Sequence, residues 1–305
     1  MPPHDRPADP IMFEAPPIAP PPAPPPLPFY RSERPVPRWG SAAMFVLLAA
    51  YVLYAGLSGS AATAKDPALP STPLGLFWST GLHLLVFAVV FALAWLAGRP
   101  SRAELYAAQK VQVLTFVFGF AWSLVLRAGI LLLGLVVIGA SMALHSGIGA
   151  ESLQQLRPKI ENLFDPKALA NPYFVLLCTT WVSFVVAGLR EELWRAGVIA
   201  SLRALFPAEW PGRRWEWLAV VIAAAIFGLG HLTQGWGAVA LTAALGLGLG
   251  GIMVVRRSLP EAILAHGFFD ALTFAALTLI SNKDLLRKLV SDPELLRQLD
   301  QILGR

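Results

Sequence analysis

The chain alternates between long apolar runs and short polar segments. A membrane-spanning helix needs roughly 20 predominantly apolar residues, and seven runs reach or approach that length. They comprise residues 41–58, 76–98, 112–143, 172–204, 217–234, 237–255 and 260–281. The third and fourth runs are long enough to tilt, kink or project beyond the hydrocarbon, and a break in the third would give an eighth span. The pattern therefore predicts an all-α fold, a polytopic helical membrane protein with about 7–8 transmembrane helices.

Composition supports the same class. Of the 305 residues, 56% are hydrophobic and 14% are charged, against roughly 25% charged residues in an average soluble domain. A soluble helical protein with a large core is the alternative that these values disfavour. The single cysteine, Cys178, cannot form an internal disulfide, so cysteine usage carries no information about the redox compartment.

Basic residues cluster at the ends of the apolar runs. Arg31, Arg34 and Arg38 precede the first run, Arg99, Arg102 and Lys110 follow the second, Arg203, Arg213 and Arg214 follow the fourth, and Arg256 and Arg257 follow the sixth. If successive runs cross in alternating directions, these positions lie on one side of the membrane, which the positive-inside rule identifies as the cytoplasm. The N-terminus is therefore predicted to be cytoplasmic. The net charge of +5 comes from these scattered positions rather than from one basic face, so no nucleic-acid partner is predicted.

The two ends of the chain differ from its apolar body, residues 41–281. Residues 1–40 hold 15 of the 26 prolines, which predicts a disordered, polyproline-like tail, either a solvated linker or a site for a partner protein. Residues 282–305 place leucines among charges, which predicts an amphipathic C-terminal helix at the membrane surface.

A run of glycines lies in the sixth apolar segment, at Gly246, Gly248, Gly250 and Gly251. A phosphate-binding loop would need a preceding strand, which this apolar context does not suggest. Small residues on a membrane helix instead let a neighbouring helix approach closely. The run therefore predicts a tight contact between two helices.

An unexpected charged cluster interrupts the fourth run. The stretch "LREELWR" places Arg190, Glu191, Glu192 and Arg195 directly after the uncharged residues 171–189. Ionised side chains in hydrocarbon are costly unless they are paired or face water, so such a cluster is a candidate functional site. At 1.5 Å per residue, the two glutamates lie about 18 Å from the charged end of their helix.

Two later runs carry polar groups at similar depths. The sequence "FGLGH" puts His231 about 21 Å from the same side of the membrane, and "HGFFD" puts His266 about 14 Å deep with Asp270 one turn further on. Three separate helices thus bring their strongly polar side chains to one level. This convergence predicts a buried aqueous cavity.

Such a set of residues suits attack of water on an amide without a covalent nucleophile. A carboxylate beside an imidazole can hold a water molecule and remove its proton. A second imidazole with a polar neighbour can stabilise the developing oxyanion. A structural role remains open for each residue singly, because Glu191–Arg195 and Glu192–Arg195 both have ion-pair spacing and either histidine could be an interhelical donor.

The three motifs, in this order and each on its own apolar run, resemble the CPBP family of intramembrane proteases. That family includes the CAAX prenyl endopeptidases and the bacterial bacteriocin-processing or self-immunity proteins. Its pattern is Glu-Glu-x-x-x-Arg, then Phe-x-x-x-His, then His-x-x-x-Asn or Asp. Phe227 to His231 matches the second motif and His266 to Asp270 matches the third, within residues 172–281. The resemblance implies an endopeptidase of the bacterial inner (cytoplasmic) membrane that uses no cofactor and no metal.

The first motif departs from the family pattern. "EELWR" has two residues between the glutamate pair and Arg195, where the family has three. An alignment on the arginine puts Arg190 at the first glutamate position, so that the catalytic carboxylate is missing or moved. An alignment on the glutamates keeps both carboxylates and displaces the arginine. We favour the second alignment.

Under the glutamate alignment, the resemblance assigns a role to each residue. Glu191 activates water with His231, and His266 with Asp270 forms the oxyanion site. An ionised Asp accepts hydrogen bonds and cannot donate one to an oxyanion, so Asp270 would instead orient His266. The candidate catalytic residues are Glu191, Glu192, His231, His266 and Asp270, with Arg190, Arg195 and Phe227 in support.

The predicted function is hydrolysis of a peptide bond near the C-terminus of a membrane-tethered or lipidated protein or peptide, within the lipid bilayer. A non-catalytic membrane adaptor or immunity protein with the same fold is one alternative, favoured by the altered first motif. A metal-dependent protease is another, since two histidines and a glutamate suit zinc, although the usual His-Glu-x-x-His helix is absent. A rhomboid-type serine site at "GLSG" around Ser58 has His83 as its nearest base and no other support. A transporter is disfavoured because no pair of similar halves is visible.

Overall fold

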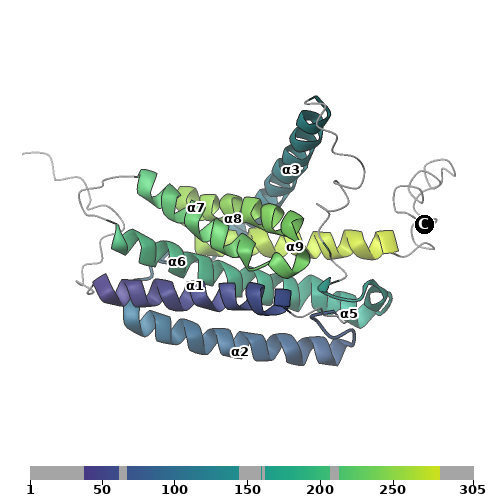
Figure 1. Cartoon of the computed structure of the whole chain (residues 1–305), viewed down its shortest axis with the longest axis horizontal. Helices are drawn as coiled ribbons and strands as arrows, with labels where there is room; N and C mark the ends of the chain where they lie inside the picture. Colours follow the sequence, from purple (N-terminus) through teal and green to yellow (C-terminus); the bar gives the residue numbers. More distant parts are fainter. Residues whose placement is uncertain (1–37, 62–66, 144–158, 160–161, 207–212, 282–305) are drawn as a thin grey trace, which may run out of the picture.

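The computed structural model (Figure 1) describes residues 38–61, 67–143, 159, 162–206 and 213–281. In this part of the chain the regular elements are all helical. They are α1 (Arg38–Ala61), α2 (Pro73–Gly98), α3 (Val113–Ala143), η2 (Pro166–Ala170), α5 (Pro172–Leu177), η3 (Cys178–Glu191), α6 (Glu192–Leu205), α7 (Arg213–Leu229), η4 (Leu232–Gln234), α8 (Trp236–Arg256) and α9 (Leu259–Ser281). The predicted all-α fold is confirmed.

Six helical segments in the described residues are long and apolar enough to cross a membrane. They are Arg38–Leu57, Pro73–Gly98, Val113–Val136, Pro172–Leu205, Trp236–Arg256 and Leu259–Ser281. The helix α3 is continuous, so the break that would have given an eighth span is absent. Pro172–Leu205 is one unbroken segment made of α5, the 14-residue π-helix η3 and α6.

The fifth predicted span, residues 217–234, is wrong in its bounds. The helix α7 begins earlier, at Arg213, and ends after 17 residues at Leu229. The chain then turns through η4, and Gly235 adopts a φ of 91°, a conformation that a glycine reaches without strain. His231 therefore lies in the turn after α7 and not within a spanning helix.

Local sequence signals account for several helix starts. Thr72 caps α2, and Asn171 caps α5 by accepting a hydrogen bond from the Tyr173 N–H at 2.9 Å; each cap is followed by proline. Proline at the first helical position costs nothing, because its missing N–H would have had no partner there. Ser258 caps α9 in the same way, since its Oγ accepts from the N–H of Glu261 at 3.2 Å.

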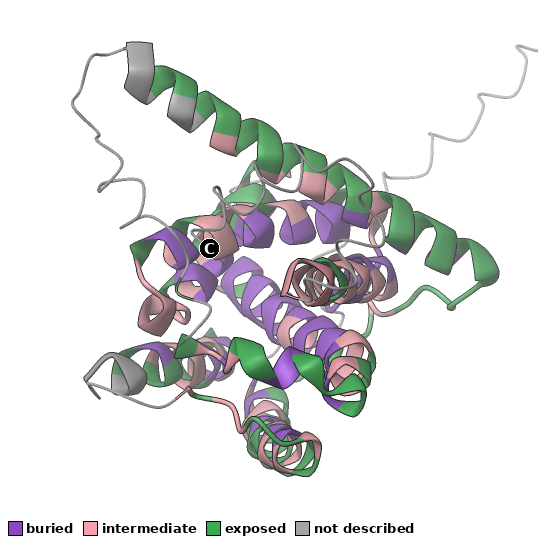
Figure 2. Cartoon of the chain, turned by 90° about the vertical axis from the view of Figure 1, so that its right-hand side faces the viewer, coloured by how far each residue is buried: buried purple, intermediate pink, exposed green. Residues whose placement is uncertain are grey.

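The helix α6 lies at the centre of the bundle and packs against α1, η3, α7 and α9. Most of its residues are buried, including Trp194, whose indole N–H donates to the Leu48 carbonyl of α1 at 2.8 Å. In Figure 2 the buried residues gather in the central helices, whereas α3 is exposed along much of its length. The charged cluster of the first motif thus lies at the start of the most enclosed helix.

The glycine run produces the close helix contact that it predicts. A Cβ atom placed on Gly246 would lie 3.3 Å from Ala224 of α7, and one on Gly250 would lie 2.7 Å from Val220 of the same helix. Gly248 faces Leu126 of α3 instead. The small residues therefore set the spacing between α7 and α8.

A buried ionic network around Glu216 joins four segments of the chain at one end of the bundle. Glu216 of α7 is almost fully buried and accepts hydrogen bonds from Arg257 at 2.5 and 2.8 Å, while Arg203 of α6 lies 3.2 Å from the same carboxylate. Tyr106 of the α2–α3 connection donates to Glu216 at 3.3 Å and accepts from Arg203 at 2.9 Å. Burial raises the pKa of Tyr106 to about 12, so its hydroxyl remains a donor at physiological pH.

Several predictions fall outside the described residues. They concern most of the proline-rich tail, the C-terminal segment 282–305 and the side chain of Ser58. The predicted boundary of the tail at residue 40 is adjusted, because α1 begins at Arg38.

Candidate active site

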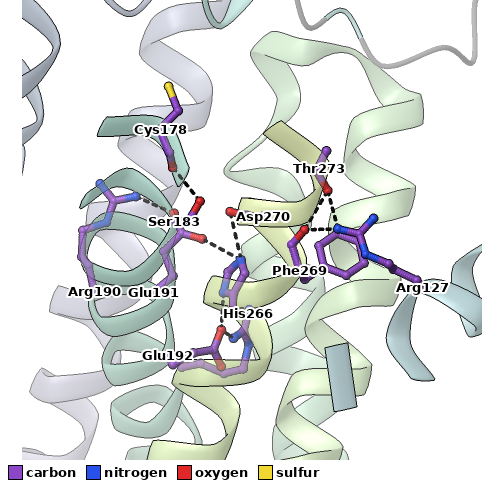
Figure 3. Close-up of polar contacts among 11 residues, drawn as sticks. Arg127, Cys178, Ser183, Arg190, Glu191, Glu192, His266, Phe269, Asp270 and Thr273 are labelled. Carbon is purple, nitrogen blue, oxygen red and sulfur yellow. Dashed lines mark hydrogen bonds and ion pairs between the residues drawn. The ribbon is translucent and has the colours of Figure 1, made fainter. Parts of the chain in front are cut away.

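The first and third motifs face each other across the contact between η3, α6 and α9. Glu191 ends η3 and Glu192 begins α6, while His266 and Asp270 lie one turn apart on α9. Figure 3 shows the imidazole of His266 between the two glutamates. Two carboxylates that are adjacent in sequence thus reach one imidazole from different directions.

Glycines allow the helices to approach closely beside this site. A Cβ atom on Gly188 of η3 would lie 2.8 Å from the backbone oxygen of Ile263 on α9. A Cβ atom on Gly267 of α9 would clash with the ring of Phe184 on η3. Any larger side chain at either position would push η3 and α9 apart.

Glu192 is completely buried and holds two partners with one oxygen. Its Oε1 accepts a hydrogen bond from Arg195 and lies 2.7 Å from Nδ1 of His266. The two residues of the Glu192–Arg195 pair are three positions apart on α6 and both have no exposed side-chain area. Positions i and i+3 share a helix face just as i and i+4 do, so the shortened motif still forms its ion pair.

The Nε2 atom of His266 faces the other two carboxylates. It lies 3.9 Å from Oε2 of Glu191 and 3.8 Å from Oδ2 of Asp270. These separations are too long for direct hydrogen bonds, and they suit an atom of water or substrate placed between the groups. Glu191 and Asp270 keep 17% and 26% of their side-chain area exposed, so both can be reached.

Arg190 holds the other oxygen of Glu191. Its Nη2 lies 2.5 Å from Oε1, and 20% of its side chain is exposed. Tyr51 of α1 and His83 of α2 lie close enough to Arg190 for an electrostatic interaction. The two glutamates of the first motif therefore have different arginine partners, Arg190 for the reachable one and Arg195 for the buried one.

His231 reaches the site from the turn after α7. Its Nδ1 lies 2.9 Å from the carbonyl oxygen of Phe227, and because a carbonyl only accepts, this nitrogen carries the proton. The other nitrogen is left as an acceptor, and His231 is close enough to Glu191 for their charges to interact. The second motif therefore lies within electrostatic range of Glu191, the reachable glutamate.

The ring of Phe227 connects all three motifs. Its centroid lies 4.8 Å from that of His231 and 6.4 Å from that of His266. The guanidinium of Arg195 is stacked 4.5 Å from the same centroid, a cation–π contact that stabilises a charge buried away from water. Phe227 thus fixes the relative positions of one side chain from each motif.

Sequence reasoning missed one charged residue near the site. Arg127 of α3 donates to the backbone oxygen of Phe269 and to Oγ1 of Thr273 at 3.0 Å, and it is close enough to Asp270 for their charges to interact. Figure 3 places it on the opposite side of α9 from Arg190. The available signal was that Arg127 is the one charged residue in the run 113–143.

The described residues contain no group of three or more His, Cys, Asp or Glu side chains arranged to hold a metal ion. Two of the acidic and imidazole groups that a metal would need, Glu192 and His266, are bonded to each other. The carboxylates of the site instead pair with arginine and histidine side chains: Glu191 with Arg190, and Glu192 with Arg195 and His266.

Comparison with known proteins identifies the segment that carries the motifs. Residues 173–272 match the family model described as Type II CAAX prenyl endopeptidase Rce1-like. No curated protein and no solved structure matches the chain. The match covers the region of all three motifs, and it confirms the resemblance to the CAAX-type intramembrane protease family.

Proposed function

We propose that the protein is a glutamate-type intramembrane endopeptidase that hydrolyses a peptide bond near the C-terminus of a membrane-tethered protein. The observation that carries this proposal is the position of His266 Nε2, which faces Glu191 at 3.9 Å and Asp270 at 3.8 Å. An oxygen atom of water or of a substrate carbonyl that bridges these groups would lie beside both a carboxylate base and an imidazole donor. The family of the matched segment consists of proteases, which supports the same reaction class.

The proposed reaction begins with water held between Glu191 and His231. Glu191 takes one proton from the water as its oxygen adds to the carbonyl carbon of the scissile bond. The carbonyl oxygen becomes an oxyanion, and the C–N bond then breaks as the leaving nitrogen takes the proton back from Glu191. The first products are an amine and a carboxylic acid, which keeps the second hydrogen of the water. The acid then loses that proton to solvent and becomes a carboxylate, and no covalent enzyme intermediate forms.

His266 is suited to bind the oxyanion if its ring carries both protons. Its Nδ1 faces the carboxylate of Glu192, which only accepts, so that nitrogen is a donor. Three surrounding carboxylates favour the positively charged imidazole, whose Nε2–H then points to the reacting carbonyl oxygen. In this assignment Asp270 supports the charge of His266, and Glu192 fixes the orientation of the ring.

The test is cleavage of a membrane-embedded reporter peptide by the purified protein in lipid nanodiscs. We expect Glu191→Gln and His231→Asn each to reduce kcat by about 10²-fold or more, because each removes part of the water-activating pair. Glu261→Gln is the matched control, since that glutamate lies at the start of α9 and pairs with Arg256 at 2.9 Å. Its activity should equal that of the wild type.

Other results would redirect the proposal. Loss of activity in Glu192→Gln with none in Glu191→Gln would move the base by one residue. Inhibition by a zinc chelator would favour the metal-dependent alternative. Full cellular function of the Glu191 and His231 variants would mean that the protein acts as a non-catalytic adaptor, and the proposal would then be rejected.

A further inference from the structure

The base of the proposed reaction is held by a guanidinium in this structure. Arg190 Nη2 lies 2.5 Å from Oε1 of Glu191. A carboxylate that already accepts a charge-assisted hydrogen bond is a weaker base than a free one. Another anion must therefore replace Glu191 as the partner of Arg190 when Glu191 accepts a proton.

The two arginine–glutamate pairs of the first motif differ in how readily a partner can be exchanged. Neither side chain of Arg195–Glu192 has any exposed area, whereas Arg190 and Glu191 keep 20% and 17%. Arg127 donates a hydrogen bond to a backbone oxygen of α9 and lies on the side of that helix opposite to Arg190 (Figure 3). Among these three intramembrane arginines, Arg190 is the one that both borders the reacting groups and remains accessible.

We propose that Arg190 binds the free C-terminal carboxylate of the substrate, and that this exchange releases Glu191 to act as the base. The inference rests on the proposed function and specifies its substrate. A guanidinium binds carboxylate with two parallel hydrogen bonds, so a substrate terminus can replace the side chain of Glu191 directly. Hydrolysis then depends on an anionic chain end.

The distances limit how long the released segment is. Arg190 is bonded to the same carboxylate that activates the water, so its guanidinium lies within one side chain's reach of the scissile carbonyl. An extended chain advances about 3.3–3.6 Å per residue. A terminal carboxylate at Arg190 therefore corresponds to release of at most about two residues.

The experiment compares two reporter peptides that differ at one end group, a free C-terminal carboxylate or a C-terminal amide. The wild type should cleave the acid with a kcat/KM about 10- to 100-fold above that of the amide, the range for losing a charge-assisted hydrogen bond. In Arg190→Gln this ratio should fall close to one, and Arg190→Lys should restore part of it. Arg127→Gln is the matched control, because it removes another intramembrane arginine and should leave the ratio unchanged.

A binding measurement separates failure of this inference from failure of the proposed function. Uncleavable versions of both peptides are titrated onto wild type and Arg190→Gln in nanodiscs. A preference for the acid that disappears with Arg190 supports the carboxylate site, even if no peptide is cleaved and the hydrolase proposal falls. Equal binding and equal cleavage of acid and amide by the wild type would overturn the inference while leaving the hydrolase intact.

Discussion

At the scale of single residues, the main result is that two adjacent glutamates have different surroundings. Glu192 is enclosed with Arg195 and His266, whereas Glu191 is reachable and faces the space beside His266. Sequence spacing could not decide between them, because Arg195 is three positions from one glutamate and four from the other, and both spacings allow an ion pair. The residue that distinguishes the two glutamates is His266, which lies on α9, 74 positions after Glu192 in the sequence.

The role of Asp270 gives a test at this scale. If Asp270 supports the charge of His266, Asp270→Asn should lose about as much activity as a variant without a polar group, because a neutral amide cannot stabilise the imidazolium. Retained activity in Asp270→Asn would instead mean that an N–H donor to the oxyanion is what matters. Asp270→Leu should lose about 10²-fold or more in kcat, since it removes every polar contact. Both variants are assayed with the same reporter and checked for unchanged thermal unfolding. Equal loss in both would show that the negative charge itself is needed.

At the scale of secondary structure, the sequence predicts most helices but not their internal geometry. Apolar runs locate the spans because length and hydropathy decide insertion, and the glycines of α8 correctly indicate a close neighbour. The π-helix η3 was not predictable, since the hydrophobic pattern of residues 178–191 does not distinguish five-residue from four-residue hydrogen bonding. The early end of α7 was missed because Gly230 and His231 continue an apolar run without a strong stop signal.

The contact between η3 and α9 gives the prediction that belongs to this scale. Gly188→Ala should lower the free energy of unfolding by about 1–3 kcal/mol, because its Cβ would meet a backbone oxygen that cannot move aside alone. It should also reduce kcat by about 10-fold or more, since Ile263 lies within one turn of His266. Thermal unfolding in detergent and reporter cleavage are the two measurements.

Gly129→Ala in α3 is the control for that substitution. No atom lies within 4 Å of the Cβ that it would add, and alanine favours a helix over glycine by about 1 kcal/mol. Its stability should be equal or slightly higher, and its activity unchanged. Equal behaviour of the two alanine variants would show that the spacing of η3 and α9 does not control the site.

At the scale of the whole molecule, the bundle is joined at one end by a buried ionic network. Glu216 connects α7 to Arg203 at the end of α6, to Arg257 at the end of α8 and to Tyr106 before α3. The basic residues that indicated one side of the membrane in the sequence are therefore partly structural. Sequence analysis could group them by side, but their shared carboxylate depends on the packing of four segments.

Loss of this network should destabilise the entire fold. Glu216→Gln removes a counter-charge from the buried Arg203 and from Arg257, whose side chain is 27% exposed. Removing one member of a buried pair costs about 3–5 kcal/mol. Glu261→Gln breaks a pair in which the side chain of Glu261 is 6% exposed but that of Arg256 is 38% exposed. Because water can solvate Arg256 when the pair is broken, the cost should be smaller, about 1 kcal/mol. Denaturation midpoints of the two variants in the same detergent provide the comparison. A smaller effect for Glu216→Gln than for Glu261→Gln would contradict the structural role of the network.

The π-helical register of η3 has a consequence for changes in chain length. Each residue removed from a regular helix turns everything that follows by about 100° around the helix axis. Because η3 ends at Glu191 and α6 begins at Glu192, loss of a single residue between Cys178 and Gly188 would redirect both carboxylates, although every site residue would still be present in the sequence. The number of residues in this segment, more than the identity of its side chains, sets where the two carboxylates point.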